Sequence, residues 1–113
     1  MAYKLKSIKQ RTGFVNNYYD VLIRKQAKPV GSKQGYMNYD VTEKTFKTEE
    51  DFEKYLNENY PTGTIKKTYQ DTVSGETYES GFIIAYNSKE YDSDKGKYVN
   101  YHNQDWFAVN KVE

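Results

Sequence analysis

One pair of residues has the types and spacing of acid–base chemistry. His102 is the single imidazole of the chain, and Asp105 follows three residues later. A catalytic triad would also need a nucleophile in a recognised frame, and the sequence contains none. We interpret His102 as a polar side chain beside a turn and predict no enzyme, no catalytic residue and no cofactor. Pairs of carboxylates brought together by folding remain the open alternative.

A second pattern could bind a cation. Asp92, Asp94 and Gly96 alternate with other residues, as oxygen ligands do in a calcium loop. An EF-hand loop requires Gly at position 6 and Glu at position 12, but counting from Asp92 places Gly at position 5 and Asn103 at position 12. We therefore interpret Asp92 to Lys97 as the loop of a β-hairpin and predict no metal site.

Positive charge is concentrated at the start of the chain. Residues 1–33 hold 8 basic side chains and 1 acidic one, although the net charge of the whole chain is only +1. If the first two predicted strands pair, these side chains form a basic face that attracts phosphates. The alternative is a solvated edge, where Lys prevents aggregation. The predicted nucleic-acid face consists of Lys4, Lys6, Lys9, Arg11, Arg24, Lys25 and Lys28.

Acidic and aromatic residues give a rival binding surface. The acidic group could imitate a phosphate backbone, or it could simply stabilise the start of a helix through the macrodipole. The aromatic group could stack on a partner or on bases, although packing within a sheet explains it equally well. The predicted partner-binding residues are Glu49, Glu50, Asp51, Glu53, Tyr98, Tyr101 and Trp106.

One helix is predicted among strands. Thr48 is the expected N-cap, and the apolar residues Phe52, Tyr55, Leu56 and Tyr60 repeat at helical spacing. Alternating apolar residues predict strands elsewhere, and Pro29 and Gly31 predict a loop over residues 26–34. The predicted strands cover residues 3–10, 18–24, 36–41, 65–71, 77–86, 98–101 and 106–112.

These elements predict the fold class. We expect an α+β fold in which one helix packs on a curved antiparallel sheet, in the order β-β-β-α-β-β-β-β. The 113 residues fit a single small domain spanning 1–113. Val, Ile, Leu and Phe are few, so the 13 tyrosines must fill part of the core while others remain exposed.

Composition also bounds the compartment. The chain has no Cys, and its start carries charge every two or three residues, unlike a secretory signal. The longest apolar run, Phe82 to Tyr86, is far shorter than the roughly 20 residues that span a bilayer. We expect a protein of the bacterial cytoplasm that does not enter a membrane.

In profile, the chain resembles the small, cysteine-free, Lys/Asn/Tyr-rich accessory proteins of phages and plasmids in low-GC Gram-positive bacteria, among them anti-CRISPR proteins. The resemblance covers the whole length but no motif, so it assigns no residue roles. It implies a host-protein partner such as an RNA-guided nuclease. We therefore expect a non-enzymatic, protein-binding inhibitor. A nucleic-acid-binding accessory protein and a phage structural or assembly subunit are the alternatives, and the oligomeric state stays open.

Overall fold

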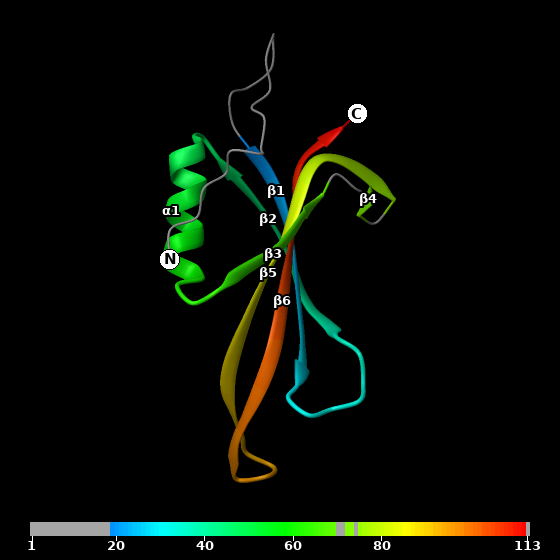
Figure 1. The fold of residues 1–113 in the computed structure, drawn as a ribbon, viewed down its shortest axis with the longest axis vertical. Helices are drawn as coiled ribbons and strands as arrows, with labels where there is room; N and C mark the ends of the chain where they lie inside the picture. The colour runs from blue at the N-terminus through cyan, green and yellow to red at the C-terminus, as the bar shows by residue number, and fades with distance from the viewer. Residues whose placement is uncertain (1–18, 70–71, 74, 113) are drawn as a thin grey trace.

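Most of this chain forms β-strands, in which successive side chains point to opposite faces of the sheet. The computed structural model describes residues 19–69, 72–73 and 75–112. One helix interrupts the strands after the second of them (Figure 1). The elements are β1 (Tyr19–Pro29), β2 (Met37–Phe46), α1 (Glu49–Asn59), β3 (Thr64–Tyr69), β4 (Thr72–Val73), β5 (Glu76–Asp92) and β6 (Lys97–Val112).

The strands form one antiparallel sheet in the order β2-β1-β6-β5-β3, and the two-residue β4 also pairs with β5. β6 lies in the centre, where Phe107 is opposite both Ile23 of β1 and Phe82 of β5. Residues that are opposite one another in such a ladder share a face of the sheet. The register therefore places Ile23, Phe82 and Phe107 on one face, which we call the helix face.

The helix α1 begins and ends where its sequence predicts. Thr48 Oγ1 accepts a 3.0 Å hydrogen bond from the backbone N–H of Asp51, which confirms the predicted N-cap. Phe52 and Leu56 are buried against the sheet, and the N–H of Tyr60 closes the last turn on the carbonyl of Leu56 at 2.8 Å. The helix lies along the upper half of the sheet in Figure 1.

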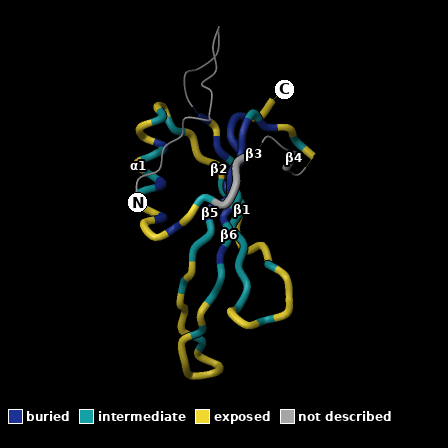
Figure 2. Tube along the Cα trace, in the orientation of Figure 1, coloured by how far each residue is buried: buried dark blue, intermediate teal, exposed yellow. Residues whose placement is uncertain are grey.

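The core lies between α1 and the helix face, and aromatic rings fill much of it. Phe82 and Phe107 stack with their centroids 4.9 Å apart, and Phe52 reaches both rings from the helix. Large aromatic rings supply buried area that the small number of aliphatic residues cannot provide. Buried residues gather in the upper half of the molecule, while the lower half is mostly half-buried or exposed (Figure 2). The buried cluster is Tyr19, Val21, Ile23, Phe52, Leu56, Tyr60, Phe82, Ile84, Phe107 and Val109.

Below the helix the β5–β6 hairpin continues as an arm, which we define as residues 86–103. Its turn is held by Asp92, whose Oδ1 accepts hydrogen bonds from the N–H groups of Asp94 and Lys95 at 2.9 and 3.2 Å. Gly96 follows with φ of 66°, a conformation that favours glycine. The predicted hairpin loop over Asp92 to Lys97 is thereby confirmed.

The predicted fold class and strand order are wrong. The chain is mostly strand, and β1 pairs with β6 rather than every strand following its neighbour in sequence. The predicted strands 98–101 and 106–112 are one continuous strand, β6, and β1 runs through Pro29 into the predicted loop. The predicted first strand, residues 3–10, lies outside the described residues.

Polarity explains the error in β6. Asn100 to Gln104 contain no aliphatic residue, and such a run is typical of a loop. In the arm these residues pair with an equally polar stretch of β5, Ala85 to Lys89. Neither face of the arm has to bury an apolar layer there, so the strand carries no hydrophobic alternation for a sequence pattern to detect.

Candidate binding groove

A groove of about 570 Å³ continues the helix face below α1. Two rows of the ladder form its floor: Tyr86, Asn103 and Ala27 are opposite one another, as are Ser88, Tyr101 and Pro29 in the next row. Volumes of this size are typical of ligand pockets. The lining residues are Ala27, Pro29, Gln34, Met37, Tyr39, Tyr86, Ser88, Glu90, Tyr101 and Asn103.

One wall of the groove depends on a β-bulge in β2. Lys25 is opposite Asp40 but Gln26 is opposite Asn38, so Tyr39 is an extra residue in β2. A bulge redirects side chains locally, and here both Tyr39 and Met37 line the groove. Their side chains are 57% and 63% exposed, although both are large and apolar over most of their surface.

A buried carboxylate lies at the upper end of the groove. Asp105 is 0% exposed, and its Oδ2 accepts hydrogen bonds from the hydroxyls of Tyr60 at 2.7 Å and Tyr86 at 3.2 Å. The side chain of Tyr86 also interacts with that of Tyr39. The second oxygen, Oδ1, accepts no hydrogen bond within the described part of the chain.

Burial dominates the ionisation of this cluster. It raises the pKa of Asp105, while the hydrogen bond from Tyr60 and the charge of Lys25 oppose the shift. Burial and the neighbouring Asp105 raise the pKa of Tyr60 and of Tyr86 far above the ordinary value for a phenol. Both hydroxyls therefore remain protonated and act as hydrogen-bond donors at any physiological pH.

The charge of the groove is negative. Among the described lining residues, Glu90 is the one with a formal charge, and three others are tyrosines. Asp105 adds a second carboxylate behind Tyr86. Tyrosine faces attract cations, and carboxylates do so more strongly. The arrangement suits a cationic or hydrogen-donating group and disfavours a phosphate.

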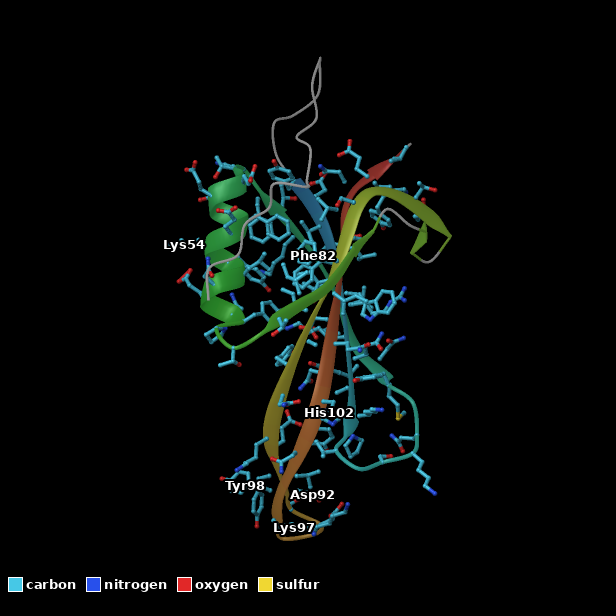
Figure 3. The ribbon with its side chains drawn as sticks, in the orientation of Figure 1. Lys54, Phe82, Asp92, Lys97, Tyr98 and His102 are labelled. Carbon is cyan, nitrogen blue, oxygen red and sulfur yellow. The ribbon has the colours of Figure 1, made fainter. Side chains whose placement is uncertain are left out.

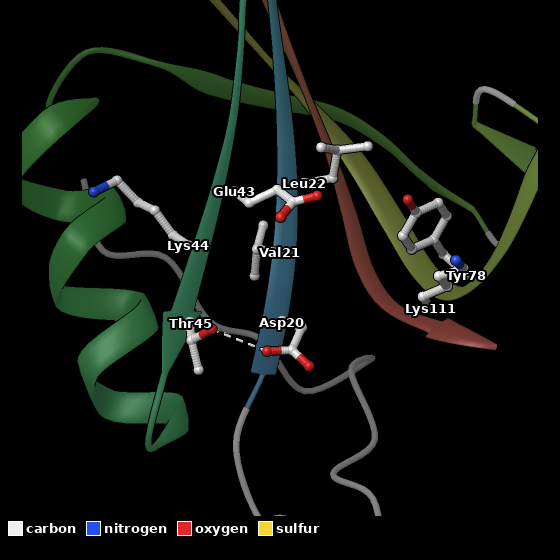
Figure 4. Close-up of a pocket in the computed structure, with 8 residues that line it drawn as sticks. All are labelled: Asp20, Val21, Leu22, Glu43, Lys44, Thr45, Tyr78 and Lys111. Carbon is white, nitrogen blue, oxygen red and sulfur yellow. Dashed lines mark hydrogen bonds between the residues drawn. The ribbon is translucent and has the colours of Figure 1, made fainter. Parts of the chain in front are cut away.

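A second hollow, of about 250 Å³, lies near the other end of the sheet (Figure 4). Several of its polar side chains already have partners in the fold: Thr45 Oγ1 donates to Asp20 Oδ1 at 2.9 Å, and Lys111 Nζ lies 3.2 Å from Glu76 Oε2. Lys44 extends toward the helix in Figure 4 and lies over the ring of Tyr55. These contacts join neighbouring strands and the helix, so most of the polar groups of this hollow already serve the fold.

The predicted partner-binding residues do not form one surface. Glu49, Glu50, Asp51 and Glu53 lie in the first half of α1, while Tyr98 lies at the tip of the arm (Figure 3). Tyr101 is the one member that lines the groove. Trp106 pairs with Arg24 and Ile83, on the face opposite Phe107.

The predicted nucleic-acid face is divided. Arg24 and Lys28 lie on the face of the sheet away from the helix. Lys25, between them in sequence, lies on the helix face, where it pairs across the strands with Asp105. Lys28 Nζ lies 5.0 Å from the centroid of the Tyr36 ring. Lys4, Lys6, Lys9 and Arg11 lie outside the described residues. The described part of β1 therefore presents no continuous basic stripe.

His102 is not beside a turn, as the sequence suggests, but within β6. Figure 3 shows it on the arm, and its Nδ1 lies 2.9 Å from Oδ1 of Asn87, the residue paired with it in β5. Asp105 is an odd number of residues away and so belongs to the other face of the strand. His102 and Asp105 are thus on opposite faces of the sheet.

The sequence predicts one of the lining residues, Tyr101, as a binding residue and misses the others, among them Tyr39, Tyr86 and Glu90. It also assigns no role in binding to Asp105. Alternation along β6 contains a signal, because Tyr101, Asn103, Asp105 and Phe107 occupy every second position. Finding it required knowing that β6 is continuous. Tyr39 carries no such signal, because its orientation depends on the bulge.

Comparison with known proteins adds no relative. No family model, no curated protein and no solved structure matches the chain. In the described residues, no helix has the length and apolarity that a bilayer span requires.

Proposed function

We propose that this chain is a non-enzymatic, protein-binding module and that its binding surface is the groove together with the arm. The observation that carries the proposal is the exposure of tyrosine rings on a paired hairpin outside the core. Tyr91 and Tyr98 are 58% and 64% exposed at the arm tip, where their rings meet edge to face with the centroids 5.2 Å apart. Exposed aromatic clusters of this kind are typical of protein interfaces.

The arm suits recognition because its backbone is already ordered. Seven residue pairs join β5 and β6 within the arm, from Tyr86 with Asn103 to Asp92 with Lys97. A partner that binds an ordered hairpin does not have to offset the entropy of ordering a loop. Tyrosine adds large contact area with few rotatable bonds and retains a hydroxyl for hydrogen bonding.

The proposed partner is a host defence nuclease of the RNA-guided class, met in the bacterial cytoplasm. The whole-chain profile shared with anti-CRISPR proteins supports this choice. Such a nuclease has an Arg- and Lys-rich surface for its nucleic acids. The negative groove is complementary to a surface of that charge.

The test mixes the purified chain with a guide-loaded RNA-guided nuclease of a low-GC Gram-positive bacterium and measures complex formation and DNA cleavage. We expect co-elution in gel filtration and reduced cleavage. Tyr91→Ala with Tyr98→Ala should weaken the complex by about 30-fold, since aromatic truncations at interface centres cost about 2 kcal/mol. Val112→Ala, exposed at the far end of β6, is the control and should bind as the parent chain does.

Two outcomes would count against the proposal. Unchanged cleavage without co-elution at micromolar concentrations would reject the nuclease as partner. A complex that tolerates the arm variant but is lost on Glu50→Gln with Glu53→Gln would move the binding surface to the acidic half of α1.

A further inference from the structure

The groove has the chemistry of a site for one particular side chain. Its lining is mainly aromatic and apolar. Among its described lining residues, the formal charge is that of Glu90. We infer that the groove binds an arginine side chain presented by the partner protein. This inference rests on the proposed function and names the chemistry of its ligand.

The floor and one wall supply the aromatic contacts. Tyr86 and Tyr101 lie in adjacent rows of β5 and β6. Tyr39 approaches from β2 closely enough for its side chain to interact with that of Tyr86. A guanidinium is planar and weakly hydrated, so it stacks on phenol rings at a low desolvation cost. An ammonium is more strongly hydrated and has no flat face to stack, so the groove favours arginine over lysine.

One carboxylate of the lining, that of Glu90, supplies the counter-charge. Glu90 is exposed on the groove wall and is free to meet the guanidinium directly through two parallel hydrogen bonds. Asp105 lies beneath the upper end of the groove, where its Oδ2 accepts the hydroxyl of Tyr86 and so helps to hold that ring in the floor.

The apolar side chains suit the stem of an arginine. Met37 forms one side, and Ala27 and Pro29 belong to the β1 edge of the floor. Three methylene groups of arginine pack on such surfaces while the charged end remains among polar groups. Lys25 is the nearby basic residue on this face, but it is opposite Asp105, one row above the floor, and does not line the groove.

The test needs only the isolated chain. A capped Gly-Gly-Arg-Gly-Gly peptide is titrated into labelled protein, and backbone amide shifts are followed by NMR. We expect millimolar binding with shifts at Ser88, Tyr101 and Asn103 and none at Leu22 on the opposite face. The same peptide with citrulline, which keeps the shape and removes the charge, should bind at least threefold more weakly.

The matched variants are Glu90→Gln and Glu76→Gln. Glu90→Gln should weaken the arginine peptide by about three- to fivefold, the range of an exposed ion pair, and leave the citrulline peptide unchanged. Glu76→Gln removes a carboxylate outside the groove and should change neither. Equal shifts from both peptides, shifts outside the groove, or insensitivity to Glu90→Gln would overturn the inference.

The outcome is separable from that of the proposed function. If the nuclease binds through the arm but the arginine peptide leaves the groove amides unmoved, this inference falls and the binding module stands. If the peptide binds as expected and the nuclease does not, the proposed partner falls and the arginine site stands.

Discussion

The hydroxyl of Tyr60, the residue that ends the helix, donates a 2.7 Å hydrogen bond to Oδ2 of Asp105 in the central strand. These residues are 45 positions apart in sequence. The contact fixes the C-terminal end of α1 over the helix face, where the ring of Tyr60 also lies 5.6 Å from that of Phe107. It therefore joins the core above to the groove below.

Tyr60→Phe should destabilise the fold. The variant keeps the ring but removes a donor from a buried carboxylate, which costs about 1–3 kcal/mol. Urea unfolding followed by circular dichroism measures the loss. Tyr91→Phe, which removes the same hydroxyl from an exposed ring, is the control and should unfold with the parent chain. Equal stability of the two variants would show that the Tyr60 hydroxyl contributes nothing.

Asp105→Asn should change how stability depends on pH. Burial raises the pKa of Asp105 in the folded state, so below the ordinary value of about 3.9 the carboxyl is protonated in both states and costs nothing. As the pH rises from there through the raised folded pKa, the unfolded state ionises more readily and stability is lost. Asn does not ionise, so the variant should gain stability relative to the parent chain as the pH rises from about 4 toward neutrality.

Urea midpoints at several pH values in that interval measure this difference. A parent chain that instead gains stability over Asp105→Asn as the pH rises would show that the hydrogen bonds from Tyr60 and Tyr86 outweigh burial, and that the pKa of Asp105 is lowered.

Thr48→Ala should weaken the helix start by about 1 kcal/mol, because Thr48 Oγ1 accepts the N–H of Asp51 at 3.0 Å. Thr48→Ser retains a hydroxyl and should stay close to the parent stability. Thermal melts of the three proteins provide the comparison. If Thr48→Ala and Thr48→Ser melt at the same temperature, the cap hydrogen bond makes no measurable contribution to stability.

Asn110→Ala should be less stable than Asn110→Gly by about 1 kcal/mol. Asn110 has φ of 58°, and a side chain with a Cβ is strained there unless local hydrogen bonds compensate. Its Oδ1 accepts the N–H of Asp20 at 2.9 Å and its Nδ2 donates to Glu79 at 3.1 Å. Both variants lose these bonds, but only Ala keeps the strain. Chemical unfolding of the pair tests the order, and a reversed order would contradict it.

The helix could be predicted because its signals are local. Thr48 and the spacing of Phe52, Leu56 and Tyr60 all lie within one short segment, and each keeps its expected role. Strand length was harder to predict. β1 and β6 extend well past their apolar residues because neighbouring strands supply hydrogen bonds to polar segments, and no local pattern records those neighbours.

The groove could not be predicted, because it combines four strands whose order depends on long-range pairing. Ala27, Tyr86 and Asn103 become neighbours only when β6 lies between β1 and β5. The acidic residues of α1 and the aromatic residues of β6 are two separate patches, and their sequence positions do not record how far apart they lie.

The central position of β6 also constrains how the protein is made. β1 emerges from the ribosome early, yet its inner edge pairs with β6, and the contact between Asp20 and Asn110 spans 90 positions. That edge has no native partner until β6 has been synthesised. Nascent chains would therefore expose it throughout translation, and crowded polysomes should favour misassembly between neighbouring copies unless a chaperone shields it.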